Sequence, residues 1–273
     1  MTLARRWRIG RSPAGVLSGA LTVVVPYVVG FSFYIYAAVG ILTGALEEGT
    51  PSVGAMAIVW GISLAGIGLG LLSARAGGIR GPELGFARVQ PRRLTGYIIV
   101  GCLAYFFMWV AFRAAQLWPA IETTGDGKIP DPLTTFLYAT NAGVTEEILI
   151  LGIPVAVMTK LRLSGWVQIP VITVGRLLIH LYYGVPIALT LAVMWSILWW
   201  FLYRKHRTLI PFICAHVLYD LVVSAGAFGS AGRILNIAAL AVLGTAVVVL
   251  TREAVMAKRN RTAPSQNRSG TEP

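Results

Sequence analysis

The stretch NAGVTEEILILG, residues 141–152, places two adjacent glutamates, Glu146 and Glu147, in a run that is otherwise apolar or built from small residues. The chain of 273 residues is 56% hydrophobic and only 12% charged, and its mean hydropathy is +0.72. A soluble domain carries roughly 25% charged residues, so this composition places the run in a lipid bilayer. Carboxylates are costly there and are usually retained for function. The two glutamates therefore mark a candidate functional segment.

Apolar blocks of the length that crosses a bilayer, about 20 residues, recur on both sides of this stretch. They predict an all-α polytopic membrane protein with about eight transmembrane helices, at 18–45, 53–73, 95–118, 133–159, 167–183, 185–203, 208–226 and 231–250. We expect residues 1–250 to form a single integral membrane domain. Residues 251–273 are polar and basic, which predicts a disordered cytoplasmic tail.

The basic residues predict how these spans are oriented. Arginines and lysines gather in the N-terminal segment, in the loops after the second, fourth and sixth spans, and in the tail, whereas Glu47 and Glu48 lie in the first loop. By the positive-inside rule both termini are cytoplasmic, which predicts a multi-pass protein of the cell (inner) membrane. This topology explains the net charge of +12, so we expect membrane lipid rather than nucleic acid as a partner. The tryptophan-rich stretch MWSILWW, residues 194–200, indicates anchoring at the membrane interface.

Ionisable residues are rare within the predicted spans. They are Arg113, Glu146, Glu147, Arg176, His180, His216 and Asp220. Adjacent positions of an α-helix differ by about 100°, so the two glutamates are not expected to point the same way. Residues four apart share a helix face, which pairs Arg176 with His180 and His216 with Asp220. One interpretation is a polar network that ties helices together. The other is a hydrolytic site, because carboxylates and imidazoles can activate water and stabilise developing charge.

These residues occur in three ordered segments: TEEILILG at 145–152, RLLIHL at 176–181 and CAHVLYD at 214–220. The segments resemble the EExxxR, FxxxH and HxxxN or HxxxD motifs of the CPBP (CAAX protease and bacteriocin-processing) intramembrane proteases. The resemblance covers about residues 130–225. Each motif alone is weak, but the ordered trio on three spans is specific. It implies an eight-helix, glutamate-dependent intramembrane endopeptidase, related to the type II CAAX prenyl endopeptidase, that acts on a peptide or a membrane-anchored protein.

The resemblance also implies a role for each residue that matches a motif. Glu146 would be the general base that activates water, and His180 would help to hold that water. His216 and Asp220 would lie on the oxyanion side. Glu147 would be structural and would face a cation.

The sequence departs from the family motifs at two positions. Leu151 stands where EExxxR has its arginine, and Arg176 stands where FxxxH has its phenylalanine. Our hypothesis is that Arg176 replaces the missing arginine as the partner of Glu147, across a helix interface. The alternative is that this chain is a non-catalytic homologue, which binds a peptide as an immunity or regulatory membrane protein.

A metal mechanism would use the same residues, although we expect no cofactor. Glu146, His180 and His216, together with Asp220, offer the nitrogen and oxygen ligands of a zinc site with one position left for water. The HExxH zinc-binding motif is absent from the sequence.

Overall fold

The computed structural model describes residues 8–46, 52–87, 90–114 and 131–225, together with isolated positions after Ala225. Throughout these ranges the regular elements are helices, so the predicted all-α class is confirmed. In chain order they are α2 (Pro13–Gly30), α3 (Ser32–Leu42), α4 (Val53–Ala76), η1 (Gly81–Leu84), α5 (Pro91–Ala114), α7 (Pro132–Glu146), η2 (Glu147–Gly152), α8 (Ile153–Lys160), α9 (Gly165–His180), η3 (Leu181–Tyr183), α10 (Val185–His206) and α11 (Ile210–Ala225).

Four helical segments are long and apolar enough to cross a membrane, which confirms the polytopic class. They are Pro13–Gly30, Val53–Ala76, Pro132–Lys160 and Val185–His206, and shorter apolar helices occupy Ser32–Leu42, Leu94–Met108 and Ile210–Ala225. The fifth predicted span, 167–183, divides into α9 and the 3-10 turn η3. The eighth, 231–250, and the tail at 251–273 lie outside the described ranges.

The first predicted span, 18–45, is divided at Phe31 between α2 and α3. There the hydroxyl of Ser32 donates to the carbonyl oxygen of Val29 at 3.0 Å, and such a local bond competes with the helical ladder. The Gly30 carbonyl accepts a 3.3 Å bond from Ser63 of α4. Because lipid offers no hydrogen bonds, a break in a span requires a partner of this kind. A Cβ atom on Gly66 of α4 would lie 2.5 Å from the Gly30 Cα, so the two helices meet through glycines.

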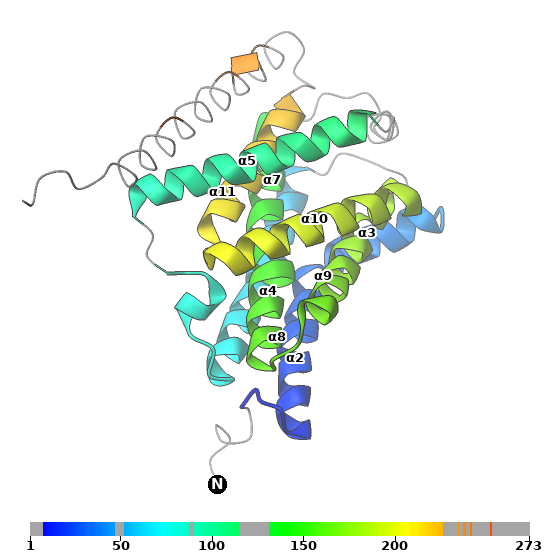
Figure 1. Cartoon of the computed structure of the whole chain (residues 1–273). Helices are drawn as coiled ribbons and strands as arrows, with labels where there is room; N and C mark the ends of the chain where they lie inside the picture. Colours follow the sequence, from blue (N-terminus) through cyan, green and yellow to red (C-terminus); the bar gives the residue numbers. More distant parts are fainter. Residues whose placement is uncertain are drawn as a thin grey trace, which may run out of the picture.

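The segment formed by α7, η2 and α8 runs through the interior of the bundle, whereas only a third of α2 and of α4 is buried. Helix α7 packs against α4 and α11, and η2 contacts α2, α4 and α9. Figure 1 shows α9, α10 and α3 grouped on one side of the bundle, and α5 crossing α11 at the end away from the N-terminus. The glutamates are therefore carried by the segment that most other helices surround.

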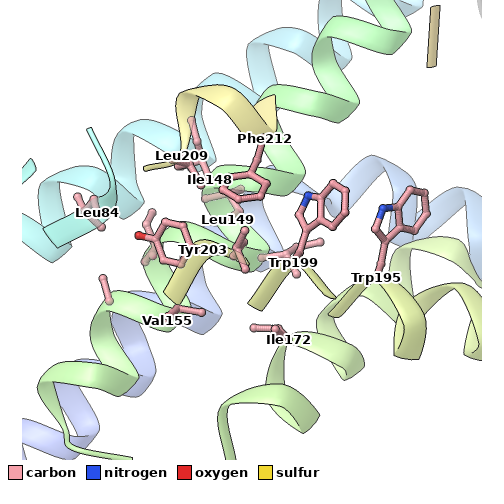
Figure 2. Packing of buried hydrophobic residues seen from close by; sticks show 14 of the residues in the cluster. Leu84, Ile148, Leu149, Val155, Ile172, Trp195, Trp199, Tyr203, Leu209 and Phe212 are labelled. Atoms are coloured by element: carbon pink, nitrogen blue, oxygen red, sulfur yellow. The ribbon is translucent and has the colours of Figure 1, made fainter. Parts of the chain in front are cut away.

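The apolar core surrounds η2 and α8 and continues onto α10 and α11. Figure 2 shows Ile148 and Leu149 of η2 near Phe212, with Trp199 and Trp195 following along α10. Trp195 and Trp199 are buried within this cluster. The expectation that the MWSILWW stretch anchors the chain at the interface is wrong for these two residues, because their helix face packs inward.

Candidate functional site

The glutamates lie where the fourth predicted span changes its helical form. Helix α7 ends at Glu146, and the next turn, η2, is a π-helix with i→i+5 hydrogen bonds. Pro154 lacks an N–H group, and in an α-helix its ring would collide with the carbonyl of Ile150. A wider turn before Pro154 avoids that collision. A Cβ atom on Gly152 would lie 2.9 Å from Leu209 Cδ2, so only a residue without a side chain fits there unchanged.

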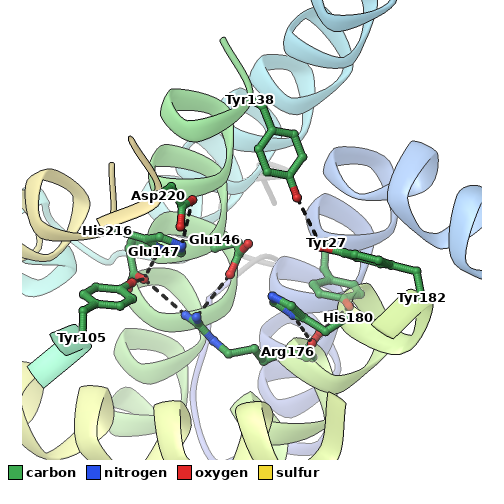
Figure 3. Close-up of polar contacts among 11 residues, drawn as sticks. Tyr27, Tyr105, Tyr138, Glu146, Glu147, Arg176, His180, Tyr182, His216 and Asp220 are labelled. Atoms are coloured by element: carbon green, nitrogen blue, oxygen red, sulfur yellow. Dashed lines mark hydrogen bonds and ion pairs between the residues drawn. The ribbon is translucent and has the colours of Figure 1, made fainter. Parts of the chain in front are cut away.

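Glu147 is the centre of a buried polar cluster. Its side chain is fully buried, and its Oε1 atom lies 2.8 Å from His216 Nδ1, 3.3 Å from Arg176 Nη2 and 3.4 Å from the Tyr105 hydroxyl. These partners come from α11, α9 and α5. Figure 3 shows the three side chains converging on this carboxylate. Glu147 therefore joins three helices through one oxygen atom.

Arg176 bridges the two glutamates. Its Nη2 atom contacts Glu147, as expected from the motif exchange, and its Nη1 atom lies 3.2 Å from Glu146 Oε2. This second contact was not expected. It has the distance of an ion pair but not the angle of a hydrogen bond, since both atoms lack a hydrogen-bond partner among the described residues. The two carboxylates point apart, as predicted, yet the forked guanidinium reaches both (Figure 3).

His180 lies one turn beyond Arg176 on α9. Its Nδ1 atom is 2.8 Å from the Arg176 carbonyl oxygen. A carbonyl oxygen only accepts hydrogen bonds, so Nδ1 carries the proton and Nε2 is left as an acceptor. This tautomer suits a residue that accepts a hydrogen bond from water.

His216 is held between two carboxylates. Its Nδ1 contacts Glu147, and its Nε2 lies 3.5 Å from Asp220 Oδ2, four residues further along α11. The predicted shared face of His216 and Asp220 is therefore present. Neither His216 nor His180 makes a hydrogen bond to Glu146 within the described part of the chain. The structure thus gathers all six predicted residues from three segments, with Arg176 rather than a histidine as the neighbour of Glu146.

The zinc alternative does not fit this arrangement. Among the described residues, no three histidine, cysteine, aspartate or glutamate side chains are grouped so that they could hold a metal ion. The guanidinium of Arg176 already lies beside both glutamates, where it supplies the positive charge that a metal would bring.

Two aromatic residues of the site escaped the sequence analysis. Tyr105 donates to Glu147, and the indole ring of Trp195 lies 5.9 Å from the ring of His180 and 5.7 Å from that of His216. A search for ionisable residues within spans does not find neutral aromatic side chains. Arg113, the remaining intramembrane cation of the sequence, has a side chain outside the described part of the structure.

Residues 129–222 match the family model for the type II CAAX prenyl endopeptidase Rce1-like proteins. This range contains all six predicted site residues and agrees with the 130–225 range of the motif resemblance. No curated protein matches the chain, and no solved structure does. The relationship to the CPBP and CAAX protease family that the three motifs predicted is thus confirmed, over residues 129–222.

Proposed function

We propose that the chain is an intramembrane endopeptidase in which Glu146 activates a water molecule for attack on a peptide bond. The observation that carries this proposal is the difference between the two adjacent glutamates. Glu147 has no exposed side-chain surface and is held by three side chains, whereas Glu146 keeps 8% of its side chain exposed and has one ion-pair partner among the described residues. A general base must reach water and substrate, and of the two glutamates only Glu146 keeps side-chain surface through which they could reach it.

In this mechanism Glu146 takes a proton from water while the oxygen attacks the carbonyl carbon, and the same proton passes to the departing amine. The neutral Nε2 of His180 accepts a hydrogen bond from the water and orients it. His216, supported by Asp220, lies on the side where negative charge develops on the carbonyl oxygen. Glu147 holds Arg176 and His216 in place.

The Rce1-like match makes a prenylated peptide with a C-terminal CAAX tail the first substrate to test, and membrane-anchored proteins the next. The proposal includes a multi-pass location in the cell membrane with both termini cytoplasmic, and requires no cofactor. One observation favours a second candidate, a non-catalytic peptide-binding homologue. Arg176 lies at ion-pair distance from the proposed base itself, so the Glu146 carboxylate faces a guanidinium on the side where a hydrolase would need it to face water.

The variant Glu146→Gln separates these candidates. Purified protein in detergent is incubated with a fluorogenic farnesylated CAAX peptide, and binding of the same peptide is measured in parallel. Loss of the general base should lower turnover by about 10²- to 10⁴-fold while binding is retained. The matched control is Glu83→Gln, because Glu83 bonds the backbone of Arg80 outside the site and should leave turnover unchanged. Cleavage that survives in Glu146→Gln refutes the assigned role, and peptide binding without cleavage by the unaltered chain supports the regulatory candidate.

A further inference from the structure

Trp195 of α10 occupies the centre of the site without a role in the mechanism above. Its side chain is only 6% exposed, and its ring packs against the rings of both histidines. The guanidinium carbon of Arg176 lies 5.0 Å from the ring centroid, and the Tyr105 ring meets it edge-on at 5.3 Å. One indole thus contacts site residues from α9, α11 and α5. Figure 2 shows it at the end of the row of buried aromatic residues.

The indole nitrogen of Trp195 is a buried hydrogen-bond donor that has no protein partner among the described residues. An indole N–H can only donate, and a buried polar group left unpaired in a native structure requires an explanation. Trp199, one turn further along α10, also has an unpaired indole nitrogen. Its ring, however, packs against Tyr105 at 4.5 Å and Phe212 at 5.7 Å. The unpaired donor of Trp195 is distinguished by its position between the two histidines.

The uncharged donors of the two histidines and of Tyr105 are already engaged. His216 has Nδ1 on Glu147 at 2.8 Å and Nε2 facing Asp220. His180 donates through Nδ1 to a backbone carbonyl, and Tyr105 donates to Glu147. A substrate carbonyl oxygen that gains negative charge needs a donor aimed at it. Compared with the donors of His216, His180 and Tyr105, the indole N–H of Trp195 has no such engagement within the described residues.

We propose that Trp195 Nε1–H donates a hydrogen bond to the carbonyl oxygen of the peptide bond that is cleaved, as that oxygen becomes negatively charged. This inference rests on the proposed endopeptidase function and assigns a further substrate-contacting residue to it. The indole is then a fixed neutral donor to the oxyanion, while His216 beside it stays engaged with Glu147 and Asp220. No bond is made or broken by the indole.

The test compares Trp195→Phe with Trp199→Phe. Each variant removes one buried indole N–H from the same helix and keeps an aromatic ring, so packing losses are matched. With the farnesylated CAAX peptide, Trp195→Phe should lower kcat about 100-fold, at the lower end of the range seen for loss of one oxyanion donor, and should change KM less than about threefold. A lower kcat at constant KM identifies an interaction made in the transition state. Trp199→Phe should keep kcat within about twofold.

A second measurement does not depend on turnover. A peptide aldehyde forms a tetrahedral hydrate that resembles the intermediate, and the corresponding peptide alcohol does not. Trp195→Phe should weaken binding of the aldehyde about tenfold and leave binding of the alcohol unchanged. Trp195→His, which keeps a ring N–H, should recover part of the loss and also serves if Trp195→Phe does not fold.

The outcomes separate this inference from the proposed function. If the unaltered chain cleaves the peptide and Trp195→Phe does so equally well, the inference alone is wrong. Equal losses in Trp195→Phe and Trp199→Phe also overturn it, because packing would then explain both. If the unaltered chain does not cleave but binds the aldehyde in a Trp195-dependent manner, the endopeptidase proposal fails, and Trp195 is a donor to a bound ligand rather than to the oxygen of a cleaved bond. Absence of both cleavage and Trp195-dependent binding overturns both.

Discussion

The replacement of Arg176 by leucine tests whether one guanidinium compensates both glutamates. Arg176 is buried, lies 3.2 Å from Glu146 and 3.3 Å from Glu147, and covers the face of Trp195. In Arg176→Leu, Glu147 keeps its contacts with His216 and Tyr105 but loses its positive partner. Glu146 loses the only cation within ion-pair distance in the described structure.

Removal of one member of a buried ion pair typically lowers the free energy of unfolding by about 3–5 kcal/mol, because the remaining charge is left uncompensated. For a protein of this size 1 kcal/mol corresponds to about 2–4 °C in Tm. We therefore expect Arg176→Leu to lower Tm on the order of 10 °C. The matched control is Arg204→Leu, since Arg204 also covers a tryptophan, at 5.5 Å, and bonds Thr159 but has no carboxylate within ion-pair distance among the residues that the structure describes. The Arg204→Leu change should lower the free energy of unfolding by about 1 kcal/mol or less.

The second change, Leu151→Arg, restores the arginine of the family motif. Leu151 lies four residues after Glu147, and helical side chains lean towards the N-terminus, so an arginine there can reach back to Glu147. It compensates one carboxylate rather than two, and we expect the double variant to recover about half of the lost Tm. Thermal unfolding in detergent, followed by a thiol-reactive dye, measures all four proteins. A double variant no more stable than Arg176→Leu would refute the exchange of arginines between the motifs.

Two further predictions concern the helix interface and the metal. A Cβ atom on Gly143 would lie 2.5 Å from Val217 Cγ2 and 3.0 Å from its backbone nitrogen, so Gly143→Leu should push α11 and His216 away from α7. We expect Gly143→Leu to lower the free energy of unfolding by about 1–3 kcal/mol and peptide cleavage at least about tenfold. The control Gly61→Leu, which has open space around its Cβ, should change neither Tm nor cleavage. Equal effects of the two variants would contradict the interface argument. Since the site residues do not form a metal-binding group, incubation with 1,10-phenanthroline should leave cleavage unchanged, and a loss that added zinc reverses would show that the zinc alternative is correct.

The sequence was sufficient to predict the helical class, the segment that carries the glutamates and the contact between Arg176 and Glu147. The helical class follows from the number and length of the apolar runs, and the order of the motifs indicates which spans carry the polar residues. A cation that is missing at Leu151 and present at Arg176 is a pairwise signal that needs no coordinates. These predictions were correct because each depends only on residue identity and approximate spacing.

Other features depend on geometry that residue identity does not specify. Trp195 and Trp199 lie in a stretch whose composition fits an interface anchor, and only helix packing turns them inward. The sequence also did not predict that Arg176 would reach Glu146. On a regular helix the two glutamates point about 100° apart, and that angle takes no account of how far a forked arginine side chain can reach. The break at Phe31 depends on a bond between Ser32 and Val29 that hydropathy does not register.

The π-helical turn at Glu147–Gly152 has a consequence for comparing this chain with its relatives. A turn with i→i+5 bonds holds more residues than an α-helical turn, so the face of α8 is displaced relative to that of α7. A helical wheel drawn with a constant 3.6-residue period through this segment would assign Pro154 and the residues after it to the wrong side. Structural correspondence across this point should therefore be established separately for the stretch ending at Glu146 and the stretch starting at Ile153, with a one-residue offset permitted between them.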